Sequence, residues 1–335
     1  MDPTCTVPIE YVDPRFFDVV PVVSVVMLVY NHAAHLAQAI ESILRQETEA
    51  PVELLIGEDC STDDSREIAL GFQRRYPDKI RIITANRNVG GYRNCMRTFD
   101  AVRGEFIAYI DGDDYWLPGK ISLQLAMLRA RPDAVAVYSN TLAVDRDGCV
   151  IGQFNDVGDR EFSLSLLLRR GNVLCMSTMM FRAERMPEVR GIGQVFIDYE
   201  MHLTHARHGC ILHAGRCLAA YRVGSAGSLV ATNNALVRSL YWQAIQGVPR
   251  SLVSDADYAH ALADFLRRVC FRAVRTKDLS LLREWVLRVF SASPYGWFRT
   301  GALVVGNVIR SSAKHLALRV MKLVFPVRPA ILYPR

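Results

Sequence analysis

Three aspartates directly follow a short apolar run. Asp111, Asp113 and Asp114 come after the residues FIAYI, which have the composition of a buried strand. Carboxylates this close repel one another unless a cation lies among them, and their oxygens suit Mg²⁺ or Mn²⁺, which can in turn bind a diphosphate. The alternative is a solvated acidic turn or a helix N-cap, because Asp is favoured at both.

Similar polar clusters end three other apolar runs. They are Tyr30-Asn31-His32, the segment 58–64 (EDCSTDD) and the segment 86–94 (NRNVGGYRN). In open α/β sheets, ligands bind beyond the carboxyl ends of the strands. We therefore expect these clusters to meet the three aspartates at one edge of a sheet.

The elements that must position these residues alternate along the first half of the chain. Strands are predicted at 22–30, 52–57, 80–84, 105–110 and 134–138, and helices at 33–46, 63–76, 92–102 and 119–131. Alternation of this kind predicts right-handed crossovers and a mainly parallel sheet. The runs 142–144 and 149–154 flank Asp147-Gly148, which indicates an antiparallel hairpin. From residue 236 onward the pattern is helical.

Composition excludes several classes of protein. Of 335 residues, 50% are hydrophobic and 22% charged, which is typical of a globular chain. The eight cysteines form no CxxC pair, the N-terminal residues are acidic, and the longest apolar stretches are too short to cross a bilayer. We predict a cytoplasmic protein with reduced thiols and no nucleic-acid partner. Residues 265–335 carry 14 Lys and Arg against two acidic residues, so the basic excess is C-terminal.

Four ordered segments together resemble the family 2 glycosyltransferases. They are VSVVMLVYNH, LLIGEDCSTDDS, NRNVGGYRN and RGEFIAYIDGDDYWLPGKISLQ, and the resemblance covers about residues 21–225. It implies an inverting enzyme of the GT-A fold, a Rossmann-like α/β domain with a mixed sheet, which moves a sugar from a nucleotide-diphosphate donor to a hydroxyl acceptor. Synthesis of cell-envelope polysaccharide or glycolipid is the expected setting. We expect an N-terminal arm at 1–20, the GT-A domain at 21–235 and a basic helical region at 236–335.

The resemblance also assigns the nucleotide-sugar site. It implies that Leu28 and Tyr30 line the base pocket, and that Asp59 accepts a hydrogen bond from the base. Core packing is the alternative for Tyr30. For Asp59 the alternative is an N-cap of the helix beginning near Asp63.

The resemblance places three more residues on the donor and its metal. Arg93 would approach the nucleotide, Asp111 the ribose, and Asp113 an Mg²⁺ or Mn²⁺ ion bound to the diphosphate. One departure affects this site: Gly224, in the segment YRVG, stands where the family often has a histidine. A histidine contribution to the metal or diphosphate is therefore expected to be missing.

The segment FIDYEM at 196–201 resembles the acidic motif that holds the catalytic base of this family. Asp198 matches the base, which removes a proton from the acceptor hydroxyl in a single displacement. Its alternative is an N-cap of a helix at 199–207. His202, His205 and His208, with Asp198 one turn earlier, are a second alternative, because such a set can bind zinc for hydrolysis.

Two further interpretations concern the whole chain and its tail. A non-catalytic nucleotide-sugar binding or scaffold protein is the alternative function, although such a protein does not need both Asp113 and Asp198. In the tail, a predicted helix at 302–325 has an apolar stripe and, on its other face, Arg310, Lys314, Arg319 and Lys322; the stripe comprises Val305, Ile309, Ala313, Leu316, Val320 and Leu323.

This pattern predicts a helix on the anionic cytoplasmic face of a membrane, with Trp297 and Phe298 just before it at the headgroup level. The alternative is that the stripe packs on the catalytic domain or on a second subunit.

Overall fold

The structure is a computed structural model that describes residues 9–193, 195–224, 233–324 and 330–331. Its strands are β1 (Ile9–Tyr11), β2 (Val23–Val29), β3 (Val52–Glu58), β4 (Ile80–Thr84), β5 (Phe106–Asp111), β6 (Tyr115–Trp116), β7 (Ala134–Val144), β8 (Val150–Gln153), β9 (Arg160–Phe162), β10 (Met180–Arg182), β11 (Cys210–Arg222) and β12 (Ala330–Ile331). The α-helices of the first part are α1 (Ala33–Leu44), α2 (Ser65–Arg75), α3 (Gly91–Phe99), α4 (Lys120–Ala130), α5 (Leu164–Arg170), α6 (Met186–Arg190) and α7 (Asp198–His208).

The strands form one mixed sheet in the order β1-β4-β3-β2-β5-β10-β7-β11-β6. Strands β4, β3, β2 and β5 are parallel, as the alternating pattern predicts, whereas β10 is antiparallel to both β5 and β7. The predicted hairpin is confirmed, because β7 and β8 pair antiparallel. The predicted strand at 134–138 and the run at 142–144 are a single strand, β7. It pairs in parallel with β11 over most of its length, which holds the intervening polar residues in extended form.

Alternation along the central strands divides the core between the two faces of the sheet. In β2, Val23, Val25 and Met27 contribute to the cluster under α1, α2 and α4. Val26 points the other way, toward the cluster that includes α3, α5 and α7. Parallel strands covered on both faces are almost continuously apolar, which explains the run VVSVVMLV, interrupted only by Ser24, at this point of the sequence.

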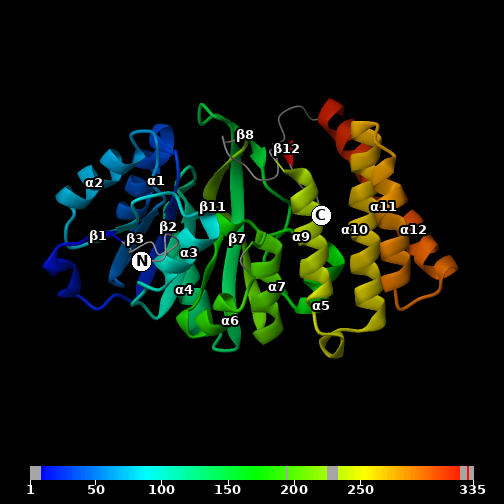
Figure 1. Cartoon of the computed structure of the whole chain (residues 1–335), viewed down its shortest axis with the longest axis horizontal. Coiled ribbons are helices and arrows are strands. Elements are labelled where there is room, and N and C mark those ends of the chain that lie inside the picture. Colours follow the sequence, from blue (N-terminus) through cyan, green and yellow to red (C-terminus); the bar gives the residue numbers. More distant parts are fainter. Residues whose placement is uncertain (1–8, 194, 225–232, 325–329, 332–335) are drawn as a thin grey trace.

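The C-terminal region is helical, as predicted, and comprises α9 (Asn234–Gln246), α10 (Asp255–Thr276), α11 (Ser280–Ala292) and α12 (Trp297–Val324). Figure 1 shows α10, α11 and α12 at the opposite end of the molecule from α1 and α2. Helix α10 packs on α5, and the buried Trp285 of α11 joins the same core as α3, α5 and α7. The helical region therefore shares a core with one face of the sheet. Among the described residues, no helix is long and apolar enough to cross a membrane.

The tail helix begins earlier than the predicted start at residue 302. Helix α12 starts at Trp297, so Trp297 and Phe298 form its first turn. Its inward face holds Thr300, Leu303 and Val304, one residue out of step with the predicted stripe.

The described members of that stripe, Val305, Ile309, Ala313 and Leu316, are exposed. Packing of the stripe on the catalytic domain is therefore wrong for these residues. The side chains of Val320, Leu323, Lys314, Arg319 and Lys322 lie outside the described residues.

Candidate active site

A glycine brings the acidic turn against the end of β2. The N–H of Gly112 donates to the carbonyl of Leu28 at 2.9 Å. A Cβ atom at this position would lie 2.8 Å from Nδ1 of His32 and 2.9 Å from Cγ2 of Val29. Only glycine allows so close an approach without a shift of its neighbours. The carboxyl ends of β2 and β5 therefore meet, as the strand-end pattern predicts.

The three aspartates of the turn have different surroundings. Asp111 accepts a hydrogen bond from the hydroxyl of Tyr109 at 2.7 Å. Asp114 is held on both oxygens, by the hydroxyl of Ser177 at 2.5 Å and the backbone N–H of Arg222 at 2.8 Å. Within the described ranges, the carboxylate of Asp113 has no hydrogen bond, although the residue is only 8% exposed. Asp113 is thus the carboxylate left open for a ligand.

Burial and mutual repulsion disfavour the ionised forms of these carboxyl groups. Burial, together with the charges of Asp113 and Asp198, raises the pKa of Asp111 to about 7. Burial and the charges of Asp113 and Asp111 raise the pKa of Asp114 well above its usual value. A solvated acidic turn would show neither effect, and the N-cap of the following helix α4 is Gly119. Both alternatives are therefore wrong for this cluster.

These oxygen donors fit Mg²⁺ or Mn²⁺, because a cation among them would offset the repulsion. In the part of the chain that the structure describes, no group of three or more His, Cys, Asp or Glu side chains is arranged to hold a metal ion by itself. A cation on Asp113 would therefore need further oxygen ligands from a bound diphosphate and from water.

Arg222 holds the acidic turn at 111–114 in place. The resemblance to the family did not assign this role to it. The side chain is 2% exposed. Its Nε donates to the carbonyl of Asp113 at 3.0 Å, and its Nη1 donates to the carbonyl of Asp145 at 2.8 Å. A third donor reaches Oε1 of Gln38 on α1 at 3.1 Å. An arginine after a long apolar strand run was the available signal, because a buried arginine must have several acceptors.

Glu58, at the end of β3, belongs to the scaffold of the site. It accepts hydrogen bonds from the N–H of Ser61 at 2.5 Å, Nε of Arg66 at 2.7 Å and the hydroxyl of Thr84 at 2.8 Å. Burial alone would raise the pKa of Glu58, but these donors outweigh burial and lower it. The carboxylate ties the ends of β3 and β4 to α2.

Asp59 is buried next to it and holds the loop that precedes α3. Its two oxygens accept the N–H groups of Val89 and Gly90, each at 2.9 Å. The N-cap interpretation of Asp59 is wrong, because Asp64 is the N-cap of α2. The carboxylate lies at the strand edge where the resemblance places the nucleotide base, and that role stays a prediction.

The remaining residues of the predicted nucleotide site lie at the same strand edge. Leu28 is half-buried in β2, and Tyr30, just beyond it, is 45% exposed, so core packing is wrong for Tyr30. Arg93 is exposed on α3 and has no contact with Asp59 among the described interactions. Arg97, one turn further along α3, donates to the carbonyl of Glu58 at 2.8 Å and lies 3.4 Å from Oδ1 of Asp59. The spacing of four residues could have indicated Arg97, since both arginines share one face of the helix.

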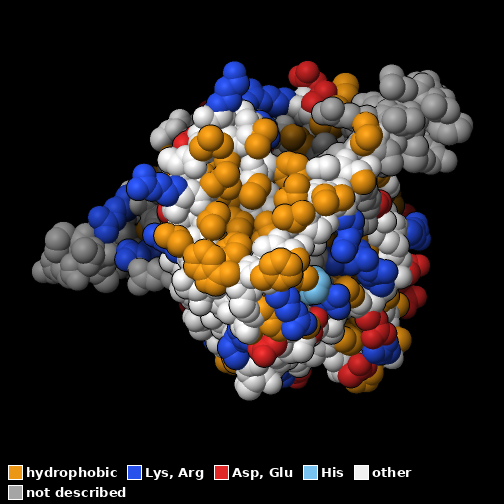
Figure 2. Space-filling view, turned by 90° about the vertical axis from the view of Figure 1, so that its right-hand side faces the viewer, with side chains coloured by type: hydrophobic (Ala, Val, Ile, Leu, Met, Phe, Trp, Pro, Cys, Tyr) orange, Lys and Arg blue, Asp and Glu red, His pale blue; other side chains and the backbone are white. Residues whose placement is uncertain are grey.

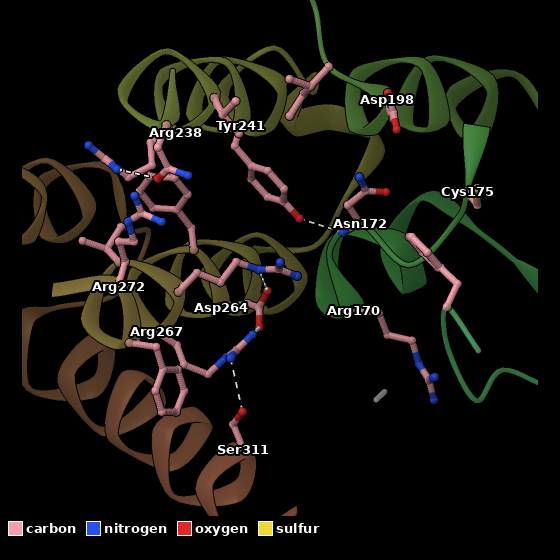
Figure 3. A pocket seen from close by; sticks show the side chains of 18 of the residues that line it. Arg170, Asn172, Cys175, Asp198, Arg238, Tyr241, Asp264, Arg267, Arg272 and Ser311 are labelled. Atoms are coloured by element: carbon pink, nitrogen blue, oxygen red, sulfur yellow. Dashed lines mark hydrogen bonds and ion pairs between the residues drawn. The ribbon is translucent and has the colours of Figure 1, made fainter. Parts of the chain in front are cut away.

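Asp198 faces the acidic turn across a cavity of about 1000 Å³. Asp111, Ser177 and Asp198 all line this cavity. Figure 3 shows Asp198 at the start of α7, with its carboxylate open to the cavity. The residue is the first of the helix, and its N-cap is Ile197, so the N-cap interpretation of Asp198 is wrong. The surrounding protein desolvates the carboxylate and raises the pKa of Asp198 above its usual value, although the cavity leaves it accessible.

The histidines on α7 do not form the zinc site considered above. His202 is buried, with Nδ1 3.1 Å from Oδ1 of Asn172. His205 is buried against the ring of Phe181, with centroids 4.7 Å apart, and His208 lies nearer the surface. Burial lowers the pKa of His202 and of His205 to about 3. No three of these groups converge, so the zinc alternative is wrong.

Comparison with known proteins indicates the family of this chain. Residues 24–160 match the model of Glycosyl transferase family 2. An uncharacterized protein of Mycobacterium tuberculosis is 27% identical over 274 residues, which are 81% of this chain and 75% of that protein. The Escherichia coli protein named UDP-Glc:alpha-D-GlcNAc-diphosphoundecaprenol beta-1,3-glucosyltransferase WfaP is 30% identical over 180 residues, 53% of this chain and 66% of that protein.

A solved structure supports the fold. Staphylococcus aureus TarS 1-349, crystallised in complex with UDP-GlcNAc, matches with a TM-score of 0.62 at 18% identity. The match covers 84% of this chain and 83% of the TarS chain. The likeness shows the GT-A fold with helices after it. The matched segment, this fold and the carboxylates gathered at the sheet edge identify the chain as a glycosyltransferase of family 2.

Proposed function

We propose that this glycosyltransferase inverts the configuration of the transferred sugar and depends on Mg²⁺ or Mn²⁺. The observation that carries the proposal is that Asp111, beside the open carboxylate of Asp113, and Asp198 line one cavity. A single displacement needs a leaving-group site and a base on opposite sides of the sugar. The presence of both Asp113 and Asp198 therefore favours sugar transfer over a non-catalytic binding function.

Asp113 and Asp111 are the residues that would hold the cation and the donor. A bound divalent cation supplies charge that stabilises the departing nucleotide diphosphate. Leu28, Tyr30, Asp59 and Arg93 stay the predicted residues for the nucleotide, and their position at the ends of β2 and β3 and on α3 supports this role.

Asp198 is proposed as the base. It takes the proton of the acceptor hydroxyl as that oxygen bonds to the anomeric carbon and the bond to the nucleotide diphosphate breaks. A raised pKa suits this role, because a base whose pKa lies closer to the working pH removes a proton more effectively. The acceptor is a hydroxyl of a glycan or of a lipid-linked sugar, and the diphosphoundecaprenol in the name of the E. coli relative supports the latter.

We also place the reaction on the cytoplasmic face of an anionic membrane. Figure 2 shows apolar side chains gathered over the end of the molecule formed by the C-terminal helices. This apolar face consists of exposed side chains from α10 to α12 and the turn between α10 and α11: Val274, Leu279, Leu287, Trp297, Phe298, Val305, Ile309 and Leu316. Phe298 is 93% exposed. The basic excess of residues 265–335 complements anionic lipid. We therefore propose that the apolar face binds an anionic lipid surface.

The test separates the two carboxylates. Asp113→Ala and Asp198→Asn should both abolish transfer with the fold intact. Asp113→Ala should also lose the thermal stabilisation by a nucleotide-sugar in the presence of Mn²⁺, whereas Asp198→Asn should keep it. NMR of the product should show the anomeric configuration opposite to that of the donor. Retention, or near wild-type turnover of Asp198→Asn, would reject the mechanism.

A further inference from the structure

The cavity beside Asp198 has a second wall that belongs to the helical region. This helical wall consists of residues of α9, α10 and α12, whereas α5 and the end of the sheet supply other parts of the lining. The N–H of Asn172 donates to the hydroxyl of Tyr241 on α9 at 2.6 Å, which joins the two walls. A molecule that presents a hydroxyl to Asp198 therefore has its remaining part against the helical wall.

The lining of this cavity is strongly basic. It contains eight arginines, whereas its acidic residues are Asp111, Asp198 and Asp264. Asp264 is already paired, with Arg267 at 2.6 Å and Arg268 at 2.8 Å. Six of the eight arginines belong to α9, α10 and α12, so the cationic excess lies on the helical wall.

Several guanidinium groups on this wall have N–H groups for which the described residues offer no acceptor. Nη1 of Arg238 donates to Oδ1 of Asn234 at 2.8 Å, but its buried Nε has no hydrogen-bond partner among the described residues. The buried Nη2 of Arg268 has none either. Arg272, one turn further along α10, lines the cavity with no side-chain hydrogen bond or ion pair to any described residue. Buried charged donors without acceptors are unfavourable, so the wall is built for an anion.

Figure 3 shows Arg238 and Arg272 on the side of the cavity opposite Asp198. We propose that Arg238, Arg268 and Arg272 bind a phosphate or diphosphate ester of the acceptor, while a hydroxyl of the same molecule lies at Asp198. The planar guanidinium fork matches phosphate oxygens, and arginine binds them with two parallel hydrogen bonds. This inference rests on the proposed function of Asp198.

Binding of inorganic pyrophosphate to the full chain in EDTA tests the inference. Without a divalent cation, the Asp113 site cannot hold the anion, so calorimetry reports the arginine wall. The wild type should bind pyrophosphate, and Arg238→Gln/Arg272→Gln should bind it roughly tenfold to a hundredfold more weakly, as expected for lost charge-assisted hydrogen bonds. Arg272→Gln alone should weaken binding without lowering the melting temperature, because it breaks no contact between described residues.

Two controls identify the site. Asp113→Ala and Arg283→Gln, the latter on the exposed face of α11, should leave pyrophosphate binding unchanged. Absence of binding by the wild type, or a loss in Asp113→Ala with no change in the arginine variants, would overturn the inference. Neither result would bear on inversion or on the base, because this experiment involves no donor and no turnover.

A second arm distinguishes the sources of the phosphate. Decyl diphosphate and a glycerol phosphate oligomer compete with pyrophosphate in the same assay. Tighter binding of decyl diphosphate would support a lipid-linked diphosphate acceptor, and tighter binding of the oligomer a phosphate-containing polymer. If neither competes, the wall does not bind phosphate esters and the inference is wrong.

Discussion

Arg222→Met should both destabilise the protein and abolish transfer, although Arg222 is not expected to touch either substrate. Its guanidinium holds the carbonyl of Asp113, two carbonyls of the β7–β8 turn and the side chain of Gln38. Met has a similar length but donates no hydrogen bond. The turn that carries Asp113 then loses its side-chain connection to α1 and to the turn after β7.

The size of the effect follows from the burial of each acceptor. The carbonyl of Asp113 belongs to a buried residue, and leaving it unpaired costs about 1 to 3 kcal/mol. Asp145 and Arg146 are partly exposed, so water replaces much of what their carbonyls lose, and together with Gln38 they add about 1 kcal/mol. The free energy of unfolding should therefore fall by about 2 to 4 kcal/mol, which lowers Tm by about 4 to 10 °C.

Thermal unfolding followed by circular dichroism, with a transfer assay on the same preparations, measures both effects. Arg146→Gln is the matched control, because Arg146 is exposed and its side chain makes, among the described residues, one hydrogen bond, from Nε to the carbonyl of Gly224 at 3.0 Å. It should change Tm by less than about 1 °C and keep activity. A variant Arg222→Met with wild-type Tm and turnover would refute the role given to Arg222. Lower Tm with full turnover would show that the turn keeps its geometry without the guanidinium.

Three further predictions concern the nucleotide site, acid stability and the apolar face. Asp59→Ala should weaken donor affinity by about 1 to 3 kcal/mol in calorimetry and also lower Tm, because two buried backbone N–H groups lose their acceptor; unchanged affinity would remove Asp59 from the donor site. Burial holds the pKa of His205 near 3, against about 6.5 when unfolded, so the unfolded chain binds more protons as the pH falls through this window and stability is lost. Wild type should therefore lose about 2 kcal/mol per buried histidine between pH 7 and pH 5, and His205→Leu should lose less; equal acid sensitivity in urea unfolding would contradict this assignment. Val305→Asp/Ile309→Asp should pellet less with anionic vesicles at low salt than wild type. Leu252→Asp, at an exposed leucine before α10 that is not among the residues of the apolar face, should pellet as wild type does; equal pelleting of all three proteins would argue against lipid on this face.

Much of the fold could be predicted from residue patterns. The strands at 22–30 and 80–84 and the helices at 33–46 and 63–76 match β2, β4, α1 and α2 within two residues at each end. These elements follow from local periodicity and from turn residues, which act within a few positions of the chain. Splitting β7 was an error of the same local reasoning, because its polar residues are kept extended by pairing with β11, a strand some 70 residues later.

The positions of Asp111, Asp113 and Asp198 were also predictable, the first two from a strand end and the third from a motif. Which carboxylate stays open was not, because this depends on partners distant in sequence. Asp114 is held by Ser177 and Arg222, and Asp59 by the loop before α3.

The sequence by itself determined the parallel core, the acidic turn at its edge and the basic helical C-terminal region, because each depends on residues that are close along the chain. Tertiary structure decided what these parts do together. It placed Arg238 and Arg272 across a cavity from Asp198, and turned the apolar stripe of α12 outward by one residue. The physical reason is that burial, pKa and the lack of an acceptor are properties of a packed neighbourhood, and segments tens of residues or more apart in the sequence build each of these neighbourhoods.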